Sequence, residues 1–185
     1  WERSMSNEIG RLFQGFEDVE GTDTCKFIQR SDMPRDRTAT YVRIVVADRP
    51  RKTEPRRVRM TVGGDKVDYP GAVSTKTTDM ITAKLLFNSV ISTEGARFMG
   101  MDIKDFYLNN VLPRKEYIRI PIKLIPQEII DKYNLMDYVV DGYIYAEVGK
   151  GMYGLPQAGR VASDALVPRR MDAGYNQAHR TTRIF

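Results

Sequence analysis

Cysteine, histidine and long apolar runs are nearly absent from this chain, and each absence removes a class of protein. The 185 residues include one cysteine, Cys25, and one histidine, His179. A lone cysteine excludes an intramolecular disulfide and a cysteine-based zinc site, and a lone histidine excludes a histidine metal cluster. We find no run of about 18 apolar residues and no secretion signal. We therefore expect an intracellular protein, cytoplasmic or nuclear, with no membrane contact.

The charge balance is mildly basic. Lys and Arg number 29 against 24 Asp and Glu, which leaves a net charge of +5 and a pI of about 9.3. A positive excess suits contact with phosphate backbones, because each neutralised phosphate releases counterions. Many basic proteins bind no nucleic acid, so the charge alone leaves the partner open. The length allows one domain or two small subdomains.

The first part of the chain, residues 1–75, predicts a helix followed by a small antiparallel sheet. Helical spacing over residues 1–15 is set by Met5, Ile9, Leu12 and Phe13. Strands are predicted at residues 24–29, 39–46 and 58–62, the last closed by a turn at Gly63 and Gly64. The intervening stretch 48–57 is rich in Arg, Lys and Pro, which predicts a solvated turn between two strands.

The second part, residues 76–185, alternates helices and strands. Thr77 or Thr78 is expected to cap a helix that ends near Ser92, with an apolar face of Met80, Ile81, Leu85, Phe87, Val90 and Ile91. A buried strand is predicted at 96–102 and a short helix or turn at 105–110. Further strands are expected at 116–120 and 143–148, and further helices at 126–133 and 156–173. The predicted fold class is α+β.

Two short blocks contain the residue types that nucleotide chemistry needs. The first, Phe98–Asn109, reads FMGMDIKDFYLN and brings Asp102 to a predicted strand end. Two-metal phosphoryl transfer requires a carboxylate on a rigid strand beside a cleft, with the next carbonyl free to help hold the metal. The alternative is that Asp102 ends an edge strand and caps the helix after it. The second block, Gly151–Arg160, reads GMYGLPQAGR.

Together these blocks resemble the reverse transcriptase of copia-type retrotransposons, whose palm carries D-[VI]-K-x-[AF]-[FY]-L-N followed by YGL-x-QA. The resemblance extends to WERSMSNEIGRLFQ at 1–14, RRVRMTVGGDKVDY at 56–69 and YIRIP at 117–121. It implies a polymerase right-hand fragment, with fingers at 1–75 and part of the palm at 76–185. It also implies an RNA-directed DNA polymerase that uses Mg²⁺, an RNA template, a DNA primer (or an RNA–DNA duplex) and deoxynucleotide triphosphates.

The resemblance assigns roles within the first block. Asp102 matches the first metal-binding aspartate, and the Ile103 carbonyl is an additional ligand. Asp105 would lie near the triphosphate, although a solvated charge at a helix start explains it equally well. Tyr107 matches the aromatic under the incoming sugar, where a flat ring would disfavour a 2′-hydroxyl; an ordinary core tyrosine is the alternative. Phe106 departs from the small residue that is more common at its position.

Three residues outside that block complete the predicted nucleotide site. Arg57 and Arg59 alternate with Val58, so both guanidinium groups should leave the same strand face and suit triphosphate oxygens. A charged, solvated strand face is the alternative. Gln157 matches the position that lines the nucleotide pocket; on the residues alone it is an exposed side chain at a helix start. The resemblance predicts that Arg59, Asp102, Tyr107 and Gln157 converge on one concave surface.

The family's adjacent Asp-Asp pair is missing from this chain. In the family, that pair lies in a hairpin just after a segment that resembles residues 179–185. No Asp-Asp dipeptide occurs in this sequence. One of three carboxylates cannot hold two metals, so we expect this chain alone to be inactive and Mg²⁺ binding to be weak or absent. Because it starts at Trp1 and stops at Phe185, the chain reads as a piece of a polyprotein or a truncated copy. The alternative function is a non-catalytic nucleic-acid-binding or assembly component.

Overall fold

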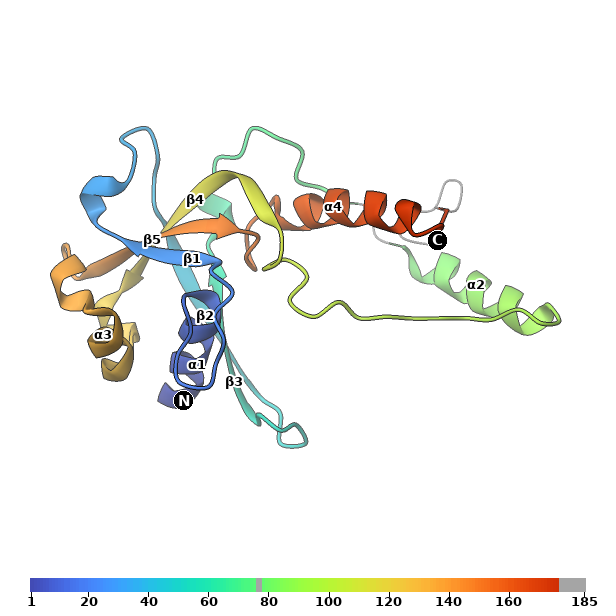
Figure 1. Ribbon diagram of the computed structural model, residues 1–185, viewed down its shortest axis with the longest axis horizontal. Coiled ribbons are helices and arrows are strands. Elements are labelled where there is room, and N and C mark those ends of the chain that lie inside the picture. The colour runs from blue at the N-terminus through green and yellow to red at the C-terminus, as the bar shows by residue number, and fades with distance from the viewer. Residues whose placement is uncertain (76–77, 177–185) are drawn as a thin grey trace.

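The computed structural model describes residues 1–75 and 78–176. They form a five-stranded sheet with α1 and α3 beside it, and α2 and α4 extend away to one side (Figure 1). The helices are α1 (Glu2–Leu12), α2 (Met80–Ser92), α3 (Gln127–Tyr133) and α4 (Ala158–Asp172). The strands are β1 (Cys25–Ile28), β2 (Thr40–Asp48), β3 (Arg56–Val62), β4 (Val111–Pro121) and β5 (Tyr143–Lys150). Thr77, one of the two expected caps, and His179 lie outside the described residues. None of the helices within these ranges is long and apolar enough to cross a membrane.

The sheet combines strands from both parts of the chain in the order β1-β5-β4-β2-β3. Its pairs are antiparallel except for β2 and β4, which run parallel with Thr40 opposite Ile118 and Tyr41 opposite Arg119. The predicted α+β class is confirmed. The expectation that residues 1–75 form a sheet of their own is wrong, because β1 pairs with β5 and β2 with β4. The subdomain boundary at residue 75 stays a prediction.

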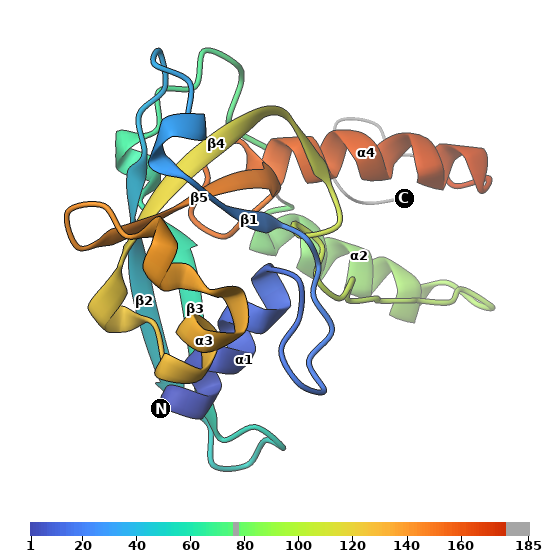
Figure 2. The same ribbon diagram turned by 60° about the vertical axis from the view of Figure 1, so that its left-hand side comes forward.

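Helix α1 packs along β3, which is an edge strand of the sheet (Figure 2). Its inner face is apolar, with Ile9 and Leu12 fully buried, and Phe13 just after the helix is buried as well. The predicted helical spacing therefore matches the helix and its packing. The ring of Phe13 stacks on Phe27 of β1 at a centroid distance of 3.9 Å, which connects the helix to the opposite edge strand.

The backbone of β3 is hydrogen-bonded along its outer edge by side chains from α1. Ser4 Oγ accepts a hydrogen bond from the Val58 amide (2.8 Å) and donates one to the Arg56 carbonyl (3.0 Å). Glu8 Oε1 accepts from the Met60 amide at 3.1 Å. Alternate residues of an edge strand direct their amides away from the sheet, and each would otherwise be open to water or to another chain. Helix α1 therefore supplies hydrogen-bond partners for the outward backbone groups of β3 as well as covering the strand.

The carboxylate of Glu8 is buried and charge-compensated. Burial raises the pKa of Glu8, while the hydrogen bond from the Met60 amide and the charges of Arg11 and Arg57 lower it. The Arg11 guanidinium lies 3.2 Å from Glu8 Oε2, and that of Arg57 lies 3.8 Å away. A buried carboxylate is tolerated when hydrogen bonds and opposite charges surround it, as they do at this position.

The second half departs from the sequence prediction at α2. Asp79 caps the helix by accepting hydrogen bonds from the Thr82 amide and hydroxyl, both at 2.8 Å, so Thr78 is not the cap. No residue of α2 is buried, and Ile91 is 85% exposed. The six predicted apolar residues therefore do not form a packed face within the described structure. The helix contacts the next segment through Phe87 and Phe98, whose ring centroids lie 4.6 Å apart.

The predicted buried strand at 96–102 is absent. Residues 96–103 have no regular structure, and residues 96–102 are exposed. A strand needs a neighbour to satisfy its backbone groups, and no strand within the described ranges pairs with this segment. Asp102 consequently does not end a strand, which corrects its predicted setting.

We predict that Ser4→Ala lowers the free energy of unfolding by about 1–3 kcal/mol, because it leaves the Val58 amide buried without a partner. Ser6→Ala is the matched control. Ser6 is also buried on α1, but its hydroxyl bonds only to the Glu2 carbonyl of its own helix, at 3.3 Å. Urea unfolding of both variants would measure the difference. Equal effects would contradict the role assigned to the Ser4 hydroxyl.

Candidate functional site

Three segments that are distant in sequence meet beside the end of β3. They are the last residues of β3, the turns at 104–110 and the loop 151–157 that leads into α4. The Val62 amide donates to the Tyr153 carbonyl at 2.8 Å, and the Gly151 amide donates to the Asn110 carbonyl at 2.8 Å. The loop 151–157 therefore links the strand to the turns. Each of the three segments overlaps one of the blocks that resemble a reverse transcriptase.

A line of aromatic and cationic side chains runs across this junction. The guanidinium carbon of Arg59 lies 5.0 Å from the centroid of the Tyr153 ring. Tyr153 meets Tyr107 edge to face, with centroids 5.5 Å apart, and Tyr107 in turn lies 5.6 Å from Phe106. Contacts of these two kinds each contribute about 0.5–1.5 kcal/mol beyond simple burial. Two of the predicted site residues, Arg59 and Tyr107, thus share Tyr153 as a neighbour.

Phe106 extends this line to a small cavity beside α4. The cavity has a volume of about 210 Å³, and its lining residues are Met101, Asp102, Ile103, Phe106, Ser163, Leu166, Val167 and Arg170. Asp102 and Ile103 reach it from the irregular segment described above. Tyr107, Arg59, Asp102 and Ile103 are thus connected through Tyr153 and Phe106. Their roles in nucleotide binding stay predictions.

Glycines allow the loop 151–157 to pack this closely. Gly154 has φ +92°, and a Cβ there would lie 2.1 Å from the Val62 carbonyl oxygen. A Cβ on Gly151 would lie 2.7 Å from the Tyr107 carbonyl oxygen. Real Cβ atoms do not approach backbone oxygens so closely, so a larger residue would displace the loop. These two glycines therefore fix where Tyr153 stands relative to Tyr107 and Arg59.

Arg57 has different partners from Arg59. Its guanidinium lies 2.7 Å from Glu54 Oε2 and 3.8 Å from Glu8 Oε2, and its side chain is 20% exposed. The two arginines therefore do not present a common pair of donors in this structure. Arg57 supports the contact between α1 and β3, and the prediction of a triphosphate-binding strand now depends on Arg59.

Gln157 is fully buried rather than exposed at a helix start. Its Nε2 donates to Glu116 Oε1 on β4 at 3.1 Å, and its own Oε1 has no hydrogen-bond partner among the described residues. Glu116 also forms salt bridges with Arg37 (Nη2 to Oε2, 2.6 Å) and Arg114 (Nη2 to Oε1, 3.0 Å). Gln157 therefore faces an internal ion cluster, and no contact or cavity in the described structure places it beside Asp102.

Sequence reasoning missed Glu116, although a signal was present. Glu116, Ile118 and Ile120 share one face of β4 by the two-residue period of a strand. Both isoleucines are completely buried and Glu116 is 4% exposed. A carboxylate at an otherwise apolar strand position predicts a buried partner of opposite charge, and the structure supplies two arginines.

Asp105 lies in the turns that follow Asp102. Its φ is +53°, a left-handed conformation that aspartate tolerates better than most residues. Its carbonyl accepts a hydrogen bond from the Asn109 amide at 3.2 Å. The structure thus gives Asp105 a turn position, as the prediction of a short helix or turn at 105–110 allows. Its proposed place near a triphosphate stays a prediction.

The donors around Asp102 do not fit a two-metal centre. The 210 Å³ cavity offers one carboxylate, that of Asp102, and it is also lined by the cation Arg170. Two-metal sites hold ions about 3.5–4 Å apart with several carboxylates between them. Residues 1–75 and 78–176 contain no group of three or more His, Cys, Asp or Glu that could hold a metal. No catalytic step through Mg²⁺ follows from this arrangement.

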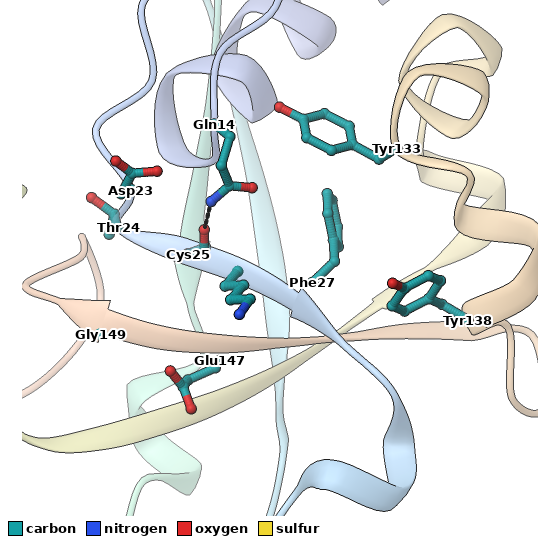
Figure 3. Close-up of a pocket in the computed structure, with 10 residues that line it drawn as sticks. Gln14, Asp23, Thr24, Cys25, Phe27, Tyr133, Tyr138, Glu147 and Gly149 are labelled. Atoms are coloured by element: carbon teal, nitrogen blue, oxygen red, sulfur yellow. Dashed lines mark hydrogen bonds between the residues drawn. The ribbon is translucent and has the colours of Figure 1, made fainter.

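A separate cavity of about 510 Å³ lies beside β1 (Figure 3). Phe27, Tyr133 and Tyr138 line its aromatic part, and Gln14 points from the end of α1 toward Cys25 (Figure 3). Gln14 Nε2 donates to the Cys25 carbonyl at 2.9 Å. Burial raises the pKa of the Cys25 thiol. None of the sequence-predicted site residues lines this cavity.

A third hollow lies between α2 and α4. It has a volume of about 580 Å³ and is mostly apolar, with three arginines at its wall. Its lining residues are Leu86, Val90, Arg97, Phe98, Met99, Gly100, Met101, Leu166, Arg169, Arg170, Ala173 and Tyr175. Met101, Leu166 and Arg170 also line the cavity at Asp102, so the two hollows are neighbours.

Comparisons with known proteins assign no family. No family model matches the chain, and no curated protein and no solved structure shows significant similarity to it. The resemblance to copia-type reverse transcriptases therefore depends on the sequence blocks, and the function that it implies is a proposal.

We predict that Gly154→Ala lowers the free energy of unfolding by more than about 3 kcal/mol or prevents folding, since a methyl group would overlap the Val62 carbonyl. Gly142→Ala is the matched control, because Gly142 has φ +79° but nothing within 4 Å of its added Cβ. Backbone strain alone should cost Gly142→Ala about 1 kcal/mol. Similar losses in the two variants, measured by urea unfolding, would contradict the tight packing of the loop.

Proposed function

We propose that this chain is the fingers and amino-terminal palm portion of a copia-type reverse transcriptase, an RNA-directed DNA polymerase. The observation that carries the proposal is the junction of three resembling blocks at Arg59, Tyr153 and Tyr107. A nucleotide site built from those blocks requires them to touch, and hydrogen bonds at 2.8 Å connect the loop 151–157 to both of the others.

Each residue then has a role in binding. Arg59 donates to phosphate oxygens, and stacking on Tyr153 restrains its guanidinium group. Tyr107 provides the flat surface under the incoming sugar. Asp102 and the Ile103 carbonyl are the oxygen donors at the neighbouring cavity.

Gln157 and Arg57 have positioning roles in this proposal. Gln157 connects the start of α4 to Glu116 and so fixes the end of the loop 151–157. Arg57 compensates Glu8 and so supports the contact of α1 with β3. Neither side chain is required to touch the nucleotide, which differs from the roles that the resemblance gives them.

A non-catalytic nucleic-acid-binding component is the second candidate function for this piece. The observation that favours it is the single carboxylate at the 210 Å³ cavity, which falls short of the ligands that two-metal transfer needs. The two candidates share binding to nucleic acid and differ in chemistry. In the first, additional sequence in the parent supplies the missing carboxylates.

We predict that the purified chain binds an RNA–DNA duplex and that Arg59→Gln weakens binding several-fold. The slope of log affinity against log salt should decrease by about 1, the change expected when one phosphate contact is lost. Arg35→Gln is the matched control, because Arg35 is exposed on a loop and makes no hydrogen bond or ion pair within the described part of the chain. Fluorescence anisotropy at several salt concentrations measures both quantities.

The same samples, supplied with Mg²⁺ and deoxynucleotide triphosphates, test whether this chain alone is catalytic. We expect no template-dependent incorporation above that of an Asp102→Ala control. Incorporation that depends on Asp102 would show that one carboxylate suffices and would reject the non-catalytic reading. Unchanged duplex affinity in Arg59→Gln would count against the site at Arg59, Tyr153 and Tyr107.

A further inference from the structure

The net charge of the chain is concentrated in the β2–β3 hairpin, residues 43–59. This hairpin contains seven Arg or Lys and two Asp or Glu, a net charge of +5. Of the chain's 29 basic and 24 acidic residues, 22 of each sign therefore lie elsewhere, and the rest of the molecule is neutral overall.

Hydrogen bonds order the loop at the end of the hairpin. The Arg49 amide donates to the Pro55 carbonyl at 2.6 Å, and the Lys52 amide donates to the Arg49 carbonyl at 2.9 Å. Glu54 Oε2 pairs with Arg57 at 2.7 Å and lies 3.7 Å from Arg49. These contacts neutralise the acid of the loop and give the loop a defined shape.

Two cations at the loop remain available for a ligand. Arg51 and Lys52 are exposed, and their side chains make no hydrogen bond or ion pair with the residues that the structure describes. Arg56 is also exposed, with its guanidinium 5.8 Å from the Trp1 ring. The cations at the loop are therefore presented to solvent while its one acid is internally paired.

The hairpin extends away from the rest of the molecule as a two-stranded ribbon (Figures 1 and 2). Val45 is 45% exposed and Val46 is 58% exposed. Val58, which pairs with Val46, is buried, so the ribbon is covered on that face at this level. The pairing continues to Asp48 opposite Arg56, just before the loop.

The loop is also separate from the site at Arg59. Arg56 lies three residues before Arg59, which corresponds to about 10 Å along an extended strand. Arg51 and Lys52 lie beyond Arg56, whereas Arg59 is at the middle of β3 with its guanidinium over Tyr153. The two groups of cations therefore cannot both serve one nucleotide.

We propose that the β2–β3 hairpin is an arm that docks on the phosphate backbone of a nucleic-acid duplex through Arg51 and Lys52. The proposal takes from the proposed function only that the chain binds nucleic acid. Binding is independent of base sequence, because exposed cations on a ribbon contact phosphates and release counterions. The arm supplies a second contact on the duplex, distinct from the contact at Arg59.

The test compares Arg51→Gln/Lys52→Gln with Arg35→Gln/Lys123→Gln, in which the replaced cations are exposed and lie outside the hairpin. Both double variants lower the net charge from +5 to +3. Anisotropy of a labelled RNA–DNA duplex at several salt concentrations should show a slope smaller by about 2 for the hairpin variant, from two lost phosphate contacts. The control should keep the wild-type slope. Two duplexes of different sequence should give the same result.

Three outcomes would overturn the arm. These are an equal effect of the two double variants, an unchanged slope in the hairpin variant, and no binding to duplex by the wild-type chain. A loss that appears with a single strand but not with a duplex would also reject the proposed docking mode. If Arg59→Gln leaves duplex binding unchanged while the hairpin variant weakens it, the site at Arg59 is rejected and the arm is supported. The reverse result rejects the arm alone.

Discussion

The open backbone edge of β3 is the constraint on which the rest of the structure depends. An edge strand presents unpaired amides, and those of Val58, Met60 and Val62 face away from β2. The Val58 amide donates a hydrogen bond to Ser4 Oγ, the Met60 amide to Glu8 Oε1 and the Val62 amide to the Tyr153 carbonyl. Two of these partners come from α1, and the third belongs to the loop that precedes α4. The same edge therefore fixes both the first helix and the candidate site.

This arrangement links the folded core to the chemistry that we propose. Because β3 is held by α1 on its outer edge and by β2 on its inner edge, Arg59 leaves a rigid strand. Tyr153 reaches Arg59 because its own carbonyl is bonded to Val62, and Gly151 and Gly154 permit that approach. The outer end of the same hairpin carries the exposed cations Arg51 and Lys52. One strand thus belongs to the core at one end and to a proposed docking arm at the other.

Much of the first half was predictable from local pattern, and the reasons are physical. The spacing of Met5, Ile9 and Leu12 gave α1, and alternation at Val58, Met60 and Val62 gave β3. Pairing across the whole sheet was not predictable, because β1 finds β5 more than a hundred residues later and nothing in the sequence of β1 indicates that partner. The apolar run at 96–102 predicted a strand, but a strand also needs a neighbour, which the described structure does not provide. Gln157 was expected at a surface, but it is buried against Glu116. The alternation of residues along β4 could have indicated that Glu116 points inward.

Native-state hydrogen exchange on β3 tests the central claim most directly, since it reports each edge amide separately. If α1 satisfies the edge, the Val58 and Met60 amide protons exchange as slowly as those of Arg59 and Thr61, which face β2. Edge amides that were open to solvent would exchange much faster than their neighbours. Rapid exchange at Val58 and Met60, with slow exchange at Arg59 and Thr61, would contradict the account.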